Sequence, residues 1–252
     1  MIDLERMKQG DYLLQCMACF VHLEPEREKA PCWPAWKKST FSTACWNSIP
    51  DDLMQVRTAA DIQTLLTSGK RGMMLTVEEG GACLDSLGAL RDLYRLGVRM
   101  MTLTWNFKNG LAEPNIVPGT DDMWPPPGQH HRRPDRKRLR ICGGDAAPAY
   151  AGGCFSPIGR RYLGYSAGGK AAFCCQPFQR ARLLPPCAQP DGRDADRHGR
   201  KGCLIGLNYC ASFLDTNPDR SQVRSRITDM ARHARYIMDK AGDGLPGLGQ
   251  RF

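Results

Sequence analysis

Two apolar runs, at residues 73–77 and 100–104, lie on either side of an amphipathic segment at residues 83–96. Strand, loop and helix in this order form the repeating unit of a parallel sheet. Further apolar runs at residues 12–21 and 203–209 predict two more buried strands. The hydrophobic pattern therefore predicts an α/β protein with a parallel sheet.

Amphipathic segments at residues 51–68, 83–96 and 221–241 predict helices, because their apolar residues recur at helical spacing. The apolar positions of the last segment are Val223, Ile227, Met230, Ala234, Ile237 and Met238. Such helices bury one face against a sheet. We expect them to form the outer layer of a βα barrel or sandwich.

The first apolar run ends in Glu78, Glu79, Gly80 and Gly81. In a βα barrel, the carboxyl ends of the strands carry the chemistry. A carboxylate followed by two glycines at such an end is a candidate metal ligand. The alternative is an acidic loop whose glycines only make the turn. Spacing alone leaves both interpretations open.

The length of the chain, its apolar runs and its first residues indicate what kind of protein it is. Its 252 residues are just adequate for one α/β barrel, which typically needs about 250. It contains no apolar run of the roughly 20 residues that span a bilayer, and its acidic start differs from a secretion signal. We expect a soluble, cytoplasmic protein without a membrane segment.

Twelve cysteines are scattered along the chain without a regular framework. In a chain of this length without a secretion signal, free thiols are favoured over disulfides. Cys16 and Cys19 have the spacing of a CxxC motif, but they lie inside the apolar run at residues 12–21. Buried strand cysteines are therefore favoured over a metal or redox pair.

The charge of the chain is concentrated in residues 128–201, which we call the basic block. The whole chain has a net charge of +9, whereas the basic block holds 15 Lys and Arg against 5 Asp and no Glu. It also contains eleven glycines, seven prolines and five cysteines, with no sustained helical or strand period. We expect a largely irregular, Gly/Pro-rich segment.

One interpretation of the basic block is a nucleic-acid-binding arm, because clustered arginines release counterions from phosphate backbones. The densest cluster comprises Arg132, Arg133, Arg136, Lys137, Arg138 and Arg140. No aromatic stacking pattern or zinc-finger spacing accompanies this charge, and the block interrupts a βα series. Nucleic-acid binding is therefore the less favoured interpretation.

Several motifs resemble those of the membrane dipeptidase (renal dipeptidase) family of zinc peptidases. The most specific is Leu-Gly-Ala-Leu-Arg-Asp-Leu-Tyr-Arg-Leu-Gly-Val-Arg-Met-Met-Thr-Leu-Thr-Trp-Asn at residues 87–106. The other matching stretches are residues 3–10 with the strand that follows, 77–81, 206–209, 213–215 and 233–237. The resemblance covers roughly the first half of the chain and residues 202–242.

This resemblance implies a (β/α)8 TIM barrel that holds two zinc ions and hydrolyses dipeptides with a metal-activated water. In such proteins a His-x-Asp pair ends the first strand, and a Glu of the Glu-Gly-Gly motif bridges the metals. Two later histidines, an Arg and a final Asp complete the site. Carried over to this chain, the bridging metal ligand falls on Glu79, and Trp105 stands where some members have a substrate-contacting His.

The other family ligands have no counterparts at matching positions. The sequence starts after the point where the His-x-Asp strand would lie. His130, His131 and His198 follow no apolar strand and are interpreted as solvated loop histidines. The expectation is one dipeptidase-like βα domain over residues 1–252 whose barrel is incomplete and whose dipeptidase activity is negligible, because catalytic zinc usually needs at least three protein ligands.

A shifted reading frame would explain the basic block. Residues 145–157 can be encoded so that reading one nucleotide later yields Met-Gln-Arg-Leu-Arg-Met-Leu-Val-Asp-Val-Ser-His, a family-like strand ending in histidine. The same shift turns residues 176–181 into Ser-His-Ser-Asn-Ala, and residues 249–252 into Gly-Ser-Asp-Phe. The hypothesis is a frameshift from about Gly128 to about Gly202 and again from about Gly244.

Three functions of different classes remain open from the sequence. The first is a zinc dipeptidase by descent, with a dipeptide as substrate and its activity intact only in the restored frame. The second is a noncatalytic remnant or scaffold with a partial barrel. The third is nucleic-acid binding through the basic block.

Overall fold

A computed structural model describes the protein at residues 3–23, 32–83, 86–102, 109–111, 151–155, 173–178, 204–207, 214, 224, 226–241 and 246–248. The chain divides into two compact units. Unit 1 holds residues 1–101 with 146–150, and unit 2 holds residues 102–145 with 151–252.

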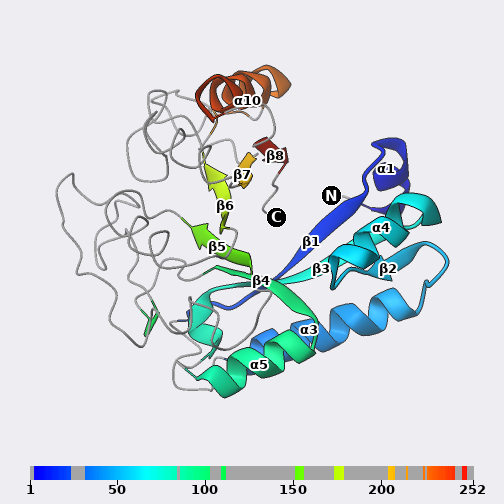
Figure 1. Ribbon diagram of the computed structural model, residues 1–252, viewed down its shortest axis with the longest axis vertical. Coiled ribbons are helices and arrows are strands. Elements are labelled where there is room, and N and C mark those ends of the chain that lie inside the picture. The colour runs from blue at the N-terminus through cyan, green and yellow to red at the C-terminus, as the bar shows by residue number, and fades with distance from the viewer. Residues whose placement is uncertain are drawn as a thin grey trace. The chain divides into compact units, whose positions relative to one another are not determined.

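Unit 1 is built on strand β3 (Arg71–Glu78), which is paired along both edges (Figure 1). On one edge β3 pairs in parallel with β1 (Leu14–Phe20). On the other edge it pairs in parallel with β2 (Leu53–Gln55) near its start and with β4 (Val98–Thr102) nearer its end. The predicted strands at residues 12–21, 73–77 and 100–104 are confirmed as β1, β3 and β4, although residues 103 and 104 lie outside the described part of the chain.

The predicted helix at residues 51–68 is wrong in its first third. Helix α4 (Ala59–Ser68) begins only after Thr58, whose hydroxyl accepts a hydrogen bond from the Asp61 N–H at 3.2 Å while the Asp61 carboxylate accepts one from the Thr58 N–H at 2.7 Å. This capping box fixes the helix start. The preceding β2 is extended because it pairs with the first residues of β3.

The predicted helix at residues 83–96 is confirmed with a later start. Helix α5 (Leu87–Arg95) is capped by Ser86, whose hydroxyl accepts a hydrogen bond from the Ala89 N–H. Its buried leucines, Leu90 and Leu93, lie three residues apart on one face, as the amphipathic pattern predicts. A short 3-10 helix, η1 (Gly80–Cys83), separates it from β3.

Two helices of unit 1 were not predicted. Helix α1 (Leu4–Gln9) is capped by Asp3, whose carboxylate accepts a hydrogen bond from the Arg6 N–H at 2.8 Å. Helix α3 (Cys32–Asn47) contacts both β1 and β2, and its buried face holds Cys32, Ala35, Ser39 and Trp46. That face is small, polar and aromatic rather than aliphatic, so it gave no clear amphipathic signal.

Helices α3 and α4 cover opposite faces of the sheet (Figure 1). The Cys19 thiol of β1 lies 3.4 Å from the Ser39 hydroxyl of α3. On the other side, Gly72 of β3 leaves room for the Leu65 side chain of α4, because a Cβ at Gly72 would lie only 2.5 Å from a Leu65 methyl. Since side chains alternate between the two faces of a strand, odd-numbered residues of β3 face α3 and even-numbered residues face the α4 side.

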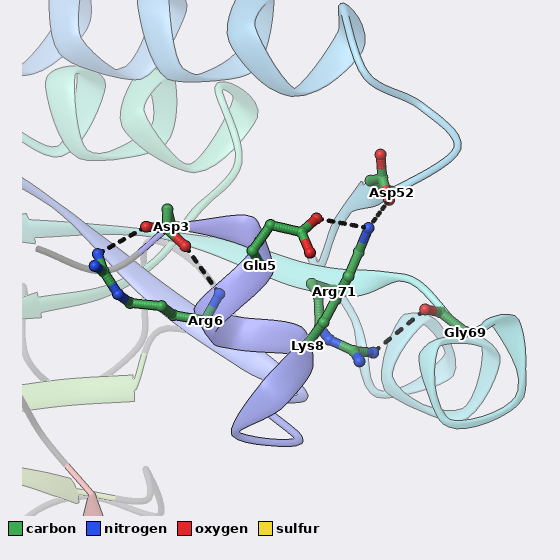
Figure 2. A network of polar contacts seen from close by, with 7 residues as sticks. All are labelled: Asp3, Glu5, Arg6, Lys8, Asp52, Gly69 and Arg71. Carbon is green, nitrogen blue, oxygen red and sulfur yellow. Dashed lines mark hydrogen bonds and ion pairs between the residues drawn. The ribbon is translucent and has the colours of Figure 1, made fainter.

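Ion pairs join α1 to the start of β2 (Figure 2). The Lys8 ammonium lies 3.0 Å from the Asp52 carboxylate and 3.6 Å from that of Glu5. The hydrogen bond to Asp52, followed by the charges of Asp52 and Glu5, raises the pKa of Lys8 above its ordinary value. The groups are solvent-exposed, so the pairs contribute little to stability.

Unit 2 contains four parallel strands in the order β5 (Ala151–Phe155), β6 (Phe173–Phe178), β7 (Leu204–Leu207) and β8 (Pro246–Leu248). The strand predicted at residues 203–209 is confirmed over residues 204–207 as β7, and residues 203, 208 and 209 lie outside the described part of the chain. Strands β5 and β6 lie within the basic block, whose remaining residues lie outside the described part of the chain. The expectation that the block is largely irregular therefore stays a prediction.

The predicted helix at residues 221–241 is confirmed from Ile227 onward as α10 (Ile227–Ala241), while Val223 of the predicted apolar face lies outside the described residues. The predicted apolar face is only partly correct, because Ile227 is 83% exposed at the helix start, whereas Ile237 is buried. Two polar side chains on the buried face, Asp229 and His233, were not anticipated. Asp229 is accommodated there by an ion pair with Arg232 at 2.5 Å.

Candidate functional site

The candidate site lies at the carboxyl end of β3, where two adjacent glutamates follow an apolar strand. Leu75 and Val77 are fully buried and fix this end of the strand in the core of unit 1. Glu78 is the last strand residue, lies in register with Phe20 of β1, and accepts a hydrogen bond at its backbone carbonyl from the Val21 N–H at 3.1 Å. Its side chain is buried.

Glu79 forms the turn between β3 and η1. Its φ angle of +98° lies in a region that residues with a side chain rarely adopt. Its side chain is fully buried, and its Oε1 atom accepts a hydrogen bond from the Gly81 N–H at 2.9 Å. Backbone strain of this kind persists only where surrounding contacts hold it in place.

Gly81 lies at a closely packed point of this turn. A Cβ atom at Gly81 would lie 2.9 Å from a Leu23 methyl and 3.0 Å from Glu79 Oε1. Both distances are shorter than ordinary van der Waals contact. A side chain at this position would therefore displace Leu23 or the Glu79 carboxylate. The glycines lie in a turn, as one interpretation of the Glu-Gly-Gly sequence predicts, and the assignment of Glu79 as a metal ligand stays a prediction.

Another residue that the sequence did not single out lies at the same edge of the sheet. His22 follows β1, and its ring centroid lies 6.2 Å from that of Phe20 in an edge-to-face arrangement. The signal for His22 was its place immediately after an apolar strand. Within the described residues, no group of three or more His, Cys, Asp or Glu side chains converges in a geometry that could hold a metal ion.

The CxxC cysteines do not form a pair. Cys16 and Cys19 are both free thiols, and three residues along a strand they point to opposite faces. Burial raises the pKa of both thiols above the ordinary value. The favoured prediction of strand cysteines is confirmed, with Cys19 buried and Cys16 half-buried.

The remaining residues singled out in the sequence lie outside the described part of the chain. They are Trp105, His130, His131 and His198. Their roles stay predictions. Among the residues that the structure describes, no helix is long and apolar enough to cross a membrane.

Solved structures of dipeptidases and related metallopeptidases have the same fold. A metallopeptidase from Rhodobacter sphaeroides, liganded with a phosphinate mimic of the dipeptide L-Ala-D-Ala, matches with a TM-score of 0.77 at 17% identity, covering 100% of this chain and 76% of that one. Dipeptidase AC, a metallopeptidase of family M19, matches with a TM-score of 0.80 at 18% identity, covering 100% and 75%.

The probable dipeptidase PvdM from Pseudomonas aeruginosa matches with a TM-score of 0.81 at 12% identity, covering 98% of this chain and 76% of that protein. At these identities the likeness shows the fold alone. It is an α/β fold with a parallel sheet that corresponds to part of the TIM-barrel structure of these proteins, as the resemblance implied.

A family model describes the first half of the chain. The model for membrane dipeptidase, peptidase family M19, matches residues 1–123, a segment that includes the Glu-Gly-Gly turn and the 87–106 motif. The resemblance stated from the sequence is thereby confirmed. Residues 1–123 of the chain thus match the membrane dipeptidase family M19.

Proposed function

We propose that this chain descends from zinc-dependent dipeptidases and that its metal centre is incomplete in the sequence as translated. The observation that carries the proposal is the pair of buried carboxylates, Glu78 and Glu79, at the carboxyl end of β3 within the segment that matches the family. The carboxyl end of a barrel strand is where this fold places its chemistry.

A zinc centre is not complete within the described residues. Zinc is bound by His, Cys, Asp and Glu, and a catalytic site usually takes three protein ligands. The described residues bring together two adjacent glutamates but no group of three such side chains. No catalytic step is therefore assigned to a metal here, and hydrolysis of dipeptides by the chain as translated is expected to be negligible.

The strand positions of unit 2 support the frameshift hypothesis. In the shifted frame proposed for residues 145–157, a Ser-His pair falls on the last residue of β5, Phe155, and on Ser156. In the shifted frame proposed for residues 176–181, a histidine replaces Pro177 near the end of β6. Both histidines would thus stand at the carboxyl ends of parallel strands, where a barrel metal site needs them.

Metal content and hydrolysis of the purified chain test the proposal. We expect less than one zinc bound per chain and no cleavage of L-Ala-D-Ala above the rate in buffer with zinc alone. Glu78→Gln and Glu79→Gln serve as matched controls. Zinc-stimulated cleavage that either substitution abolishes would show that the centre is complete and that the proposed loss of activity is wrong.

The nucleotide sequence tests the frameshift separately. Codons around Pro127, Gly202 and Gly244 should show an inserted or deleted base relative to a continuous family-like frame. An unshifted DNA sequence, together with an intact mass equal to that of the chain as written, would end this explanation.

A further inference from the structure

Strand β1 lies at one end of the strand order and is paired along one edge. In the described part of the chain, its partner is β3, with which it pairs in parallel over all seven of its residues. The other edge is called the open edge here. Ala18 of β1 is exposed, whereas β3, which is paired on both edges, has no exposed residue. The two strands thus differ in how much water reaches them.

The backbone groups on the open edge are those of the even-numbered residues of β1. The Leu13 carbonyl accepts a hydrogen bond from the Gly72 N–H of β3 at 2.8 Å. The Val21 N–H donates one to the Glu78 carbonyl of β3 at 3.1 Å. Because successive residues of a strand direct their N–H and C=O groups to opposite edges, odd-numbered residues of β1 face β3. The residues that face the open edge are Leu14, Cys16, Ala18 and Phe20.

Two side chains already occupy carbonyl groups on the open edge. The Gln15 Nε2 atom donates a hydrogen bond to the Cys16 carbonyl at 2.7 Å. The Lys38 ammonium group of α3 donates one to the Phe20 carbonyl and lies 5.8 Å from the centroid of the Phe20 ring. Both acceptors are even-numbered, in agreement with the assignment of the edge. A strand that added to this edge would need the same acceptors and would have to displace both donors.

The sequence of β1 suits pairing with a second copy of itself. Its seven residues, Leu-Gln-Cys-Met-Ala-Cys-Phe, include no charged residue, proline or glycine. Such segments pair edge to edge with like strands, and native proteins oppose this pairing with charged side chains, lysine above all. A two-fold axis at Met17 would align two copies in antiparallel orientation over the whole strand. Every cross-strand pair would then consist of two uncharged side chains.

We propose that the open edge of β1 is a self-association surface that takes a second copy of this strand, and that Gln15 and Lys38 restrain the association. Each restrains it by occupying a backbone acceptor that the incoming strand needs. Lys38 acts in a second way, because its ammonium group brings a positive charge to the edge. The inference is independent of the proposed function, since neither a metal nor hydrolysis enters it.

The substitution Lys38→Met tests the restraint, and Lys37→Met is the matched control. Both lysines are exposed residues of α3, and the hydrogen bond to the Phe20 carbonyl comes from Lys38. Loss of this charge-assisted hydrogen bond frees an acceptor on the edge, so Lys38→Met should dimerise at about five-fold lower concentration than the unsubstituted chain. Lys37→Met should dimerise as the unsubstituted chain does. Sedimentation velocity of the full chain over a concentration series measures this.

Amide hydrogen exchange locates the contact. When the concentration of Lys38→Met is raised until the chain associates, the amides of Cys16 and Ala18 should exchange about ten-fold more slowly. Those of Met17 and Cys19, which face β3, should not change. Ala18→Lys, which places a charge at the middle of the edge, should abolish association. Phe41→Lys replaces an apolar side chain that is 71% exposed on α3, and should leave association unchanged.

Four results would overturn the proposal. They are a Lys38→Met chain that stays monomeric at every concentration reached, equal effects of Lys37→Met and Lys38→Met, association that Phe41→Lys abolishes and Ala18→Lys does not, and full protection of the Cys16 and Ala18 amides in the monomer. The last result would mean that another segment of the same chain covers the edge. Should Ala18→Lys fail to fold, the lysine pair and the exchange pattern still decide.

Discussion

Strands β3 and β6 are both paired in parallel on both edges, but their sequences suit that position very differently. Strand β3 has an apolar segment, Met73 to Val77, with a single threonine in it, and it has no proline. Strand β6 contains Pro177, which has no N–H to donate to a neighbouring strand. The register between β6 and β7 shifts between Cys175 and Phe178, across this proline.

The same contrast holds for β5, where Gly152 and Gly153 supply no side chains to pack. Glycine weakens a strand interior, and proline is normally confined to edge strands or irregularities. The comparison indicates that β5 and β6 are paired strands of the parallel sheet, whereas their glycines and proline are residues that disfavour a strand interior. A sequence translated out of frame would produce this mismatch.

Restoring the reading frame is the change with the largest expected effect, because it would replace the unfavourable residues of β5 and β6. In a chain whose frame is shifted over residues 128–201 and after residue 243, the strand ends of unit 2 regain histidines and a final aspartate. If that chain also carries the His-x-Asp strand that the family resemblance implies, L-Ala-D-Ala hydrolysis should rise by a factor on the order of 10³ or more. Steady-state kinetics with added zinc measure it.

The control for this experiment restores the frame but carries Glu78→Gln and Glu79→Gln together. It should remain inactive, because the carboxylates from β3 are missing. A restored chain that folds cooperatively and still does not bind zinc would show that the mismatch in β5 and β6 has another origin.

The second test concerns the packing of unit 1. Leu75 of β3 is fully buried, and Leu75→Ala should lower the free energy of unfolding by about 2–5 kcal/mol, from lost burial and the cavity left behind. Urea denaturation followed by the tryptophan fluorescence of the chain, to which the buried Trp46 contributes, measures the change.

Leu66→Ala is the matched control, because Leu66 is 57% exposed on α4. Its effect should stay within about 0.5 kcal/mol. Equal effects of the two substitutions would mean that β3 is not the packed centre of unit 1, and the contrast between β3 and β6 would lose its basis.

Most of the sheet of unit 1 was predictable from the sequence, whereas several of its other elements were not. The apolar runs of β1, β3 and β4 are long enough to show a strand pattern. Strand β2 has only three residues, and the amphipathic pattern assigned them to the helix that follows. The helix start at Thr58 was missed because a capping residue is a weaker sequence signal than the leucines of α4. Helix α3 was missed because its buried face includes Cys32 and Ser39.

The candidate site was predictable only to the level of the motif. Two adjacent glutamates and two glycines after a strand indicated the location, but not which face of the strand end α3 covers. That depends on the contact between Cys19 and Ser39, which are distant in sequence. A tertiary contact of this kind has no local sequence signal.

The third test adds a methyl group at Gly72, near the start of β3. Gly72→Ala places a Cβ 2.5 Å from a Leu65 methyl and 2.9 Å from a Leu14 methyl, so α4 must move or the side chains must leave their rotamers. Overpacking of this kind costs about 1–3 kcal/mol. Thermal unfolding measured by circular dichroism should show a lower midpoint.

Gly88→Ala provides a control that should raise the stability instead of lowering it. Gly88 lies within α5, and the nearest atom to an added Cβ is the Ser86 hydroxyl at 3.4 Å. Alanine in place of glycine in a helix should stabilise by roughly 0.5–1 kcal/mol. If Gly72→Ala also stabilises the chain, α4 does not pack on β3 as closely as described.

The smallest expected effect concerns the cap of α4, the element that separates the predicted helix from the observed one. Thr58→Ala removes the hydroxyl that accepts from the Asp61 N–H and should cost about 1 kcal/mol at neutral pH. Asp61→Ala removes the carboxylate that accepts from the N–H groups of Arg57 and Thr58 at 2.8 and 2.7 Å.

These hydrogen bonds, first the one from the Arg57 N–H, lower the pKa of Asp61 below its ordinary value of 3.8. A carboxyl whose pKa is lowered on folding stabilises the native state above its unfolded pKa, and that contribution disappears as the pH falls through the folded pKa. The stability difference between the unsubstituted chain and Asp61→Ala should therefore be constant from pH 5 to 7 and shrink below about pH 4. A difference that persists undiminished at pH 2 would mean that the charge of Asp61 does not form the cap, and the start of α4 would then have to be fixed by the pairing of β2 with β3 alone.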